Sequence, residues 1–213
     1  MRKTILIIIT YMIVFFCVCE AQLIKSFGFK TGLAAESQKW EFSTLTNLAI
    51  DTKIRPGLDV GIFLEWLDVP YISVLTELHY IQKGAECTSN VMLTTPSRPD
   101  GIGYSFTPRL DYLSIPLLMK LRYDLPILSL YLLAGPRIDI FLSKHGDEWP
   151  LISEVYQKEN LGGSFGIGFE TFSLVPFTIG IEFRYSPNFQ NSYSANYLKV
   201  YNQSMEFLLV VGF

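Results

Sequence analysis

Apolar and polar side chains alternate along most of the chain beyond about residue 22, with a period of two residues rather than 3.6. A period of two is typical of β-strands with two different faces. The pattern predicts eight strands and no helix, and most of the strands exceed the usual length of about 5–6 residues. The predicted strands are 24–36, 53–66, 70–84, 109–123, 126–142, 160–172, 175–186 and 200–213.

Short and long connections alternate strictly between these strands. The short connections are 68–70, 124–126 and 173–176, and the long ones are 37–52, 85–108, 143–159 and 187–199. Transmembrane barrels show this alternation, with tight periplasmic turns and long outer loops. A tilted strand needs about 9–11 residues to cross a bilayer, which the predicted strands provide.

The two faces of each strand differ in charge. In the strand 109–123, one face carries Leu113, Ile115, Leu117, Met119 and Leu121, and the other carries Ser114, Pro116, Leu118, Lys120 and Arg122. A Lys or Arg that faces lipid at the midplane costs about 2–4 kcal/mol, so an uncharged face is the expected lipid face. We therefore predict an all-β fold, an eight-stranded antiparallel transmembrane up-and-down β-barrel with its polar face inside.

The predicted interior contains charges of both signs. An eight-stranded barrel is just wide enough to be filled by side chains, and buried charges must pair or stay hydrated. We expect ion pairs that plug the lumen and no open pore, with a narrow polar channel as the alternative. Interior glycines such as Gly166 and Gly168 are expected to make room for Arg and Tyr side chains. The predicted interior charges are Lys30, Asp59, Glu65, Glu77, Lys120, Arg122, Arg137, Asp139, Glu170, Glu182, Arg184 and Glu206.

The N-terminal segment has the layout of a secretory signal peptide. Arg2 and Lys3 precede an apolar stretch at 4–18, and small residues at positions 19 and 21 predict cleavage before Gln22. The expected division is a signal peptide at 1–21 and an outer-membrane β-barrel at 22–213. An uncleaved anchor is the alternative.

The C-terminal segment alternates up to Phe213. This ending resembles the terminal signal of bacterial outer-membrane barrels, in which a last strand finishing in Phe is handed to the barrel assembly machinery. The resemblance implies the cell outer membrane as the location, with its lipid and that machinery as partners. We expect Phe207, Leu209 and Val211 to face lipid, Glu206 to face the lumen, and the strand to pair with 24–34.

Charge and cysteine content exclude several classes of function. After cleavage at position 21, 15 basic and 19 acidic residues give a net charge of −4 without a basic stripe, so nucleic acid is not an expected partner. Cys87 is then alone, so no internal disulfide can form. Two His and one thiol make a structural zinc site unexpected, and no metal or cofactor is predicted.

An enzyme would need a nucleophile, a base and an acid close together, as in the barrels that hydrolyse lipid A. Two groups contain the residue types: His79 with Ser73 and Glu77 on one strand face, and His145 with Asp147 and Glu148 in a loop. We expect His79 to belong to the interior ion pairs and His145 to be a solvated loop residue. The prediction is therefore a non-enzymatic protein with no catalytic residue.

One stretch resembles a known family. Tyr112-Leu-Ser-Ile-Pro-Leu-Leu-Met-Lys120, Leu133-Ala-Gly-Pro136 and Gly166-Ile-Gly-Phe-Glu170 are similar to strands of the PorT-like β-barrel domain family of gram-negative bacteria. The resemblance implies an eight-stranded barrel in the outer membrane and no catalytic signature. The named member is associated with type IX protein secretion, but these residues do not carry that role.

Two functions follow as expectations. The barrel is either a scaffold whose outer loops bind a surface partner, with the loop 85–108 and its Cys87 as the best candidate contact, or an accessory of an envelope or secretion machine. The alternatives are a lipid A-modifying hydrolase in the outer membrane and a periplasmic lipocalin-like binding barrel.

Overall fold

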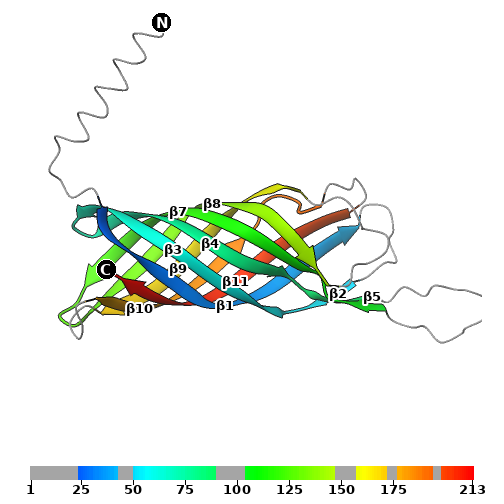
Figure 1. Cartoon of the computed structure of the whole chain (residues 1–213), viewed down its shortest axis with the longest axis horizontal. Coiled ribbons are helices and arrows are strands. Elements are labelled where there is room, and N and C mark those ends of the chain that lie inside the picture. Colours follow the sequence, from blue (N-terminus) through cyan, green and yellow to red (C-terminus); the bar gives the residue numbers. More distant parts are fainter. Residues whose placement is uncertain (1–23, 43–49, 90–103, 147–156, 172–176, 194–197) are drawn as a thin grey trace, which may run out of the picture.

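The computed structural model describes residues 24–42, 50–89, 104–146, 157–171, 177–193 and 198–213. Eight strands close into an antiparallel barrel (Figure 1), which confirms the predicted fold class. The predicted signal peptide 1–21 and the connection 173–176 lie outside the described residues. The barrel strands are β1 (Ile24–Phe42), β3 (Arg55–Val69), β4 (Ile72–Gly84), β7 (Arg109–Asp124), β8 (Leu128–His145), β9 (Glu159–Thr171), β10 (Thr178–Pro187) and β11 (Leu198–Gly212).

The first and last strands close the barrel. β1 pairs with β11 from Gly28 opposite Gly212 to Phe42 opposite Leu198, as the sequence predicts. The backbone of Phe213 continues the pairing of β1 with β11, because it exchanges two hydrogen bonds with the backbone of Phe27, at 2.7 and 3.1 Å. β1 therefore pairs with β3 on one side and with β11, the last strand, on the other.

The two ends of the barrel differ. At the turn end, Pro70 and Tyr71 join β3 to β4, and 125–127 join β7 to β8. The first of these turns lies slightly later than the predicted 68–70, because β3 continues through an irregularity after Trp66 to Val69, with Leu67 at a φ of 65°. The opposite end, where the long connections lie, is called the loop end.

Three short strands lie beyond the loop end: β2 (Ile50–Lys53), β5 (Glu86–Ser89) and β6 (Tyr104–Phe106). They form one sheet in the order β2-β5-β6. Each is adjacent in sequence to one of β3, β4 and β7, which are neighbours in the barrel, so the sheet prolongs the barrel wall (Figure 1). The treatment of 37–52 and 85–108 as plain connections was therefore wrong. We call β2, β5 and β6 the strand extension.

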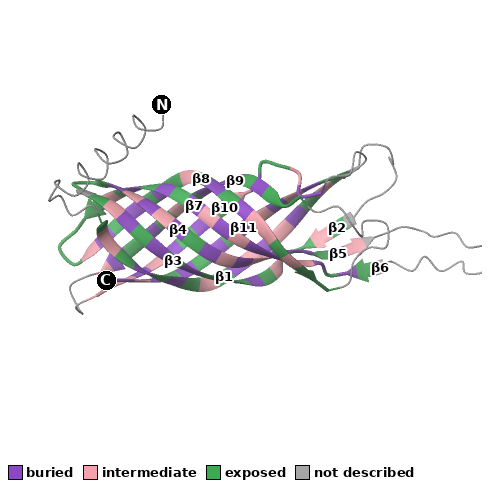
Figure 2. Ribbon diagram, turned by 45° about the horizontal axis from the view of Figure 1, so that its top comes forward, coloured by how far each residue is buried: buried purple, intermediate pink, exposed green. Residues whose placement is uncertain are grey.

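Burial alternates along the barrel strands (Figure 2). On β3, Leu58, Val60, Ile62 and Leu64 are exposed, whereas Asp59, Gly61, Phe63 and Glu65 are buried. A soluble barrel would have the opposite arrangement, so the lipocalin-like alternative is contradicted. No helix that could cross a membrane occurs within the part of the chain that the structure describes.

Candidate functional site

The lumen holds the predicted interior charges. Eleven of the twelve are at most 9% exposed, and the Arg122 side chain, near the turn end, is 18% exposed. The sequence analysis missed three further buried charges, Glu36, Lys83 and Asp111. Glu36 and Lys83 share the inward parity of their strands, whereas Asp111 lies at a register shift of β7. Most of the buried charged side chains form three clusters along the barrel axis.

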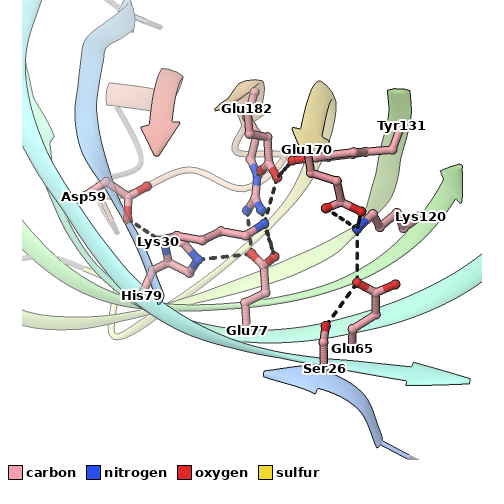
Figure 3. A network of polar contacts seen from close by, with 11 residues as sticks. Ser26, Lys30, Asp59, Glu65, Glu77, His79, Lys120, Tyr131, Glu170 and Glu182 are labelled. Carbon is pink, nitrogen blue, oxygen red and sulfur yellow. Dashed lines mark hydrogen bonds and ion pairs between the residues drawn. The ribbon is translucent and has the colours of Figure 1, made fainter. Parts of the chain in front are cut away.

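The central cluster consists of Lys30, Asp59, Glu77, His79, Glu182 and Arg184. The Lys30 ammonium donates to Glu77 and to Glu182, each at 2.8 Å, and so joins β1 to β4 and β10 (Figure 3). The Arg184 guanidinium donates to both carboxylate oxygens of Glu77, at 2.6 and 2.8 Å, and also pairs with Glu182. These contacts cross the lumen from one wall to the other.

His79 completes the central cluster. Its Nδ1 lies 2.6 Å from Asp59 and its Nε2 lies 3.1 Å from Glu77 (Figure 3). A neutral imidazole has only one N–H, whereas the charged ring donates from both nitrogens and so fits two carboxylates. With His79 charged, three cations face three anions. Gly61 permits this packing, because a Cβ there would lie 2.6 Å from the His79 ring.

The turn-end cluster is built around Lys120 and Glu65. The Lys120 ammonium donates to Glu65 at 3.1 Å and to Glu170 at 2.8 Å, and it lies 4.5 Å from the centre of the Tyr131 ring. Lys25 donates to Glu65 at 2.7 Å. Gly168 is needed here, because a side chain would collide with the Tyr131 ring, and a Cβ at Gly166 would lie 3.0 Å from Arg184. The expectation that glycines accommodate Tyr and Arg is confirmed.

The loop-end cluster links β8 to three other segments. Lys83 pairs with Asp139 at 2.6 Å, and Arg137 donates to Asn188 at 2.6 Å and lies 3.4 Å from Glu206. Each of these side chains is at most 5% exposed. The lumen is therefore crossed by ion pairs at three levels.

The grouping of His79 with Ser73 and Glu77 does not form a triad. The Ser73 hydroxyl donates to Glu65 at 2.7 Å, and both nitrogens of His79 face carboxylates. His79 therefore has no nitrogen left to activate a serine, which triad chemistry requires. His145, 56% exposed, lies 3.4 Å from Asp111, and its predicted neighbours at 147 and 148 are outside the described residues. Within those residues, no group of His, Cys, Asp and Glu could hold a metal ion.

The strand extension has a small core of its own. Ala85, Cys87 and Phe106 are buried together, and Trp40 of β1 packs against them. The Trp40 ring centre lies 6.0 Å from that of Phe106 and 5.9 Å from that of Tyr193. Burial raises the pKa of the Cys87 thiol to about 12. Cys87 is thus a packing residue of the extension and not an exposed contact.

Comparisons with known proteins agree with this architecture. The chain matches the family model of the outer membrane protein beta-barrel domain over residues 26–194. The solved structure of OprG from Pseudomonas aeruginosa is similar, with a TM-score of 0.53 at 11% identity, covering 88% of this chain and 94% of OprG. Neisserial surface protein A, NspA, matches with a TM-score of 0.45 at 14% identity, over 86% of this chain and 96% of NspA.

No curated protein matches the chain. At these identities the likeness to OprG shows the fold alone. The family match covers most of the barrel, and the outward apolar face and inward charges described above are those of a barrel in lipid. The protein therefore resides in the outer membrane and belongs to the outer membrane protein beta-barrel domain family.

Proposed function

We propose that the protein is a closed, non-enzymatic barrel that holds the strand extension outside the membrane as a binding surface for another protein. In this arrangement the turn end faces the periplasm and the loop end faces outward. The observation that carries the proposal is the extension itself, a β-sheet with its own packed core that continues the barrel wall.

The packing of the extension supports a binding role. Trp40, Phe106 and Tyr193 come from three separate segments. Trp40 has ring contacts with both of the others and packs against the core that contains Cys87. A connection that only joined two strands would not need such a core, whereas a rigid element holds its exposed side chains in a fixed arrangement, which lowers the entropy lost on binding. Glu86 and Ser105 are exposed residues of this sheet.

The ion pairs inside the lumen support the proposal that the barrel is closed to ions. The central cluster joins β1, β4 and β10 through Lys30, Glu77 and Arg184, all at most 2% exposed. An ion that passed through would have to separate these pairs, and breaking a buried pair costs about 3–5 kcal/mol. In planar bilayers we expect no stepwise conductance, and steady open-channel steps would contradict closure.

The absence of catalysis is part of the proposal. The hydrolase alternative depended on His79 and Ser73, and their partners are Asp59, Glu77 and Glu65 instead. Lipid A from cells that overproduce the protein should be unchanged.

The finer family assignment also remains a proposal. The stretch 112–120 carries the resemblance to PorT-like barrels, and a role as accessory to an envelope or secretion machine would make a component of that machine the partner. Recognition of β11 by the barrel assembly machinery is proposed on the closing position of that strand.

Site-specific photo-crosslinking tests the binding surface. A photoreactive residue would replace Glu86 or Ser105 of the extension in the full chain, expressed in its own cells. The matched control replaces Leu125, an exposed residue of the turn end. We expect one protein to be captured from both extension positions and not from the control. Capture of that protein from all three positions, or of no protein from the extension, would refute the proposal.

A further inference from the structure

A cavity of about 350 Å³ occupies the turn end of the lumen. Its lining runs from Lys25, Asp124 and Phe213 at the turn end to Lys30 and Glu182 of the central cluster. Pockets that hold small molecules have volumes of about 300–1,000 Å³. The cavity is therefore large enough for a small ligand and ends at the ion pairs that cross the lumen.

The wall of the cavity includes an apolar patch. Phe63, Leu75, Tyr131 and Val210 line it and belong to one buried cluster inside the barrel. The pairing of charges in the lumen does not by itself require these apolar side chains at the cavity wall. Apolar side chains that face a cavity favour an apolar part of a ligand, because its transfer from water onto them is favourable.

Two basic side chains near the mouth retain donor capacity. Among the described residues, Arg122 has one ion pair, from Nε to Asp124 at 3.1 Å, and the Asp124 side chain is 47% exposed. Lys25 has one ion pair within the same part of the chain, to Glu65. Guanidinium has five N–H donors and ammonium has three, so these pairs leave donors for a further anion.

Two other cations of the cavity differ from this pair. Lys30 and Lys120 each lie between two carboxylates, Glu77 and Glu182 for the first and Glu65 and Glu170 for the second. The cavity therefore combines two cations that are each paired twice, an apolar part of the wall, and two incompletely paired cations at the mouth.

The geometry points to a binding site for a small amphiphilic anion, in which a carboxylate or phosphate contacts Arg122 and Lys25 and an apolar group lies against Phe63 and Tyr131. This site is separate from the protein-binding surface at the loop end. The ligand would enter from the side of the membrane that the turn end faces, and the central cluster would stop it from crossing.

Calorimetric titration of the full protein in lipid nanodiscs tests the site, with empty nanodiscs as the blank. Phenylpropionate and phenyl phosphate carry the predicted combination of an aromatic group and an anion. Acetate lacks the apolar group, and phenylpropylamine has the opposite charge. We expect at least one of the aromatic anions to bind at least tenfold more tightly than acetate and the amine. The tighter of the two identifies carboxylate or phosphate as the preferred group.

Matched variants locate the binding. Arg122→Gln should weaken the aromatic anion at least tenfold, whereas Arg109→Gln, the same change at the loop end, should leave it unaltered. Heat-dependent migration in gels verifies that both variants fold. Equal affinity in the two variants, equal binding of the amine or acetate, or no binding of either aromatic anion would overturn the inference.

Discussion

Glu77 is the centre of the charged lumen, and Glu77→Gln is the sharpest test of what the ion pairs do. The side chain is 2% exposed and accepts from Lys30 at 2.8 Å, from Arg184 at 2.6 and 2.8 Å, and from His79 at 3.1 Å. Glutamine has nearly the same shape, but it removes the charge and presents an NH₂ donor to neighbours that are themselves donors.

The size of the effect follows from the partners that remain. Without the Glu77 charge, Lys30 and Arg184 share only Glu182, and His79 retains only Asp59. Removal of one partner from a buried ion pair destabilises a protein by about 3–5 kcal/mol. This corresponds to roughly a hundredfold or more in the equilibrium between folded and unfolded protein.

Glu36→Gln is the matched control. Glu36 is equally buried, but it forms no ion pair with a described residue, and the donor beside it is the neutral Ser204 hydroxyl. Its charge gains little from hydrogen bonding and loses its hydration, so its removal should change the free energy of unfolding by about 1 kcal/mol or less, or stabilise the barrel.

Urea unfolding in lipid vesicles, followed by tryptophan fluorescence and gel migration, measures both variants. We expect Glu77→Gln to unfold at clearly lower urea and Glu36→Gln to remain near the wild type. If the two variants lose the same stability, or if Glu77→Gln loses none, then paired charge is not what holds the lumen.

Three further predictions concern other features and are tested by the same unfolding assay or by chemical labelling. Gly168→Ala should cost about 1–3 kcal/mol because its methyl group overlaps the Tyr131 ring, and an unchanged unfolding midpoint would contradict this packing. In the folded protein, Cys87 should react slowly with maleimide at pH 8, because a pKa of about 12 leaves about one thiol in ten thousand ionised. After unfolding it should react rapidly. Fast labelling of the folded protein would refute the burial of Cys87. Leu117→Lys, near the middle of β7 on the lipid face, should cost about 2–4 kcal/mol, and Leu125→Lys at the turn end about 0–1 kcal/mol. Equal costs would contradict the placement of Leu117 in the hydrocarbon and of Leu125 at the edge of the membrane.

Strand faces could be predicted from sequence because parity alone decides whether a side chain points to lipid or lumen. Lys120 and Glu182 were placed in this way, and Glu36 and Lys83 could have been. The pairing of Lys30 with Glu77 could not, because it depends on the stagger between strands that are distant in sequence, which alternation does not encode.

The strand extension was missed for a different reason. Its strands contain three or four residues each, too few to show a period. Ile50–Lys53 and Glu86–Ser89 also contain mostly polar residues, which is a composition typical of loops. The core around Cys87 forms only because β1 brings Trp40 beside them, and no local pattern contains that contact. The candidate cavity was missed likewise, because its wall combines residues from many strands.

The pairing of β1 with β11 makes the barrel a ring, in which every barrel strand has a paired neighbour on each side. Without β11, β1 and β10 would each have one unpaired side. Each backbone group left unpaired in hydrocarbon costs several kcal/mol. Damage to either closing strand therefore leaves unpaired backbone groups in the membrane and affects the closure of the whole barrel instead of one edge.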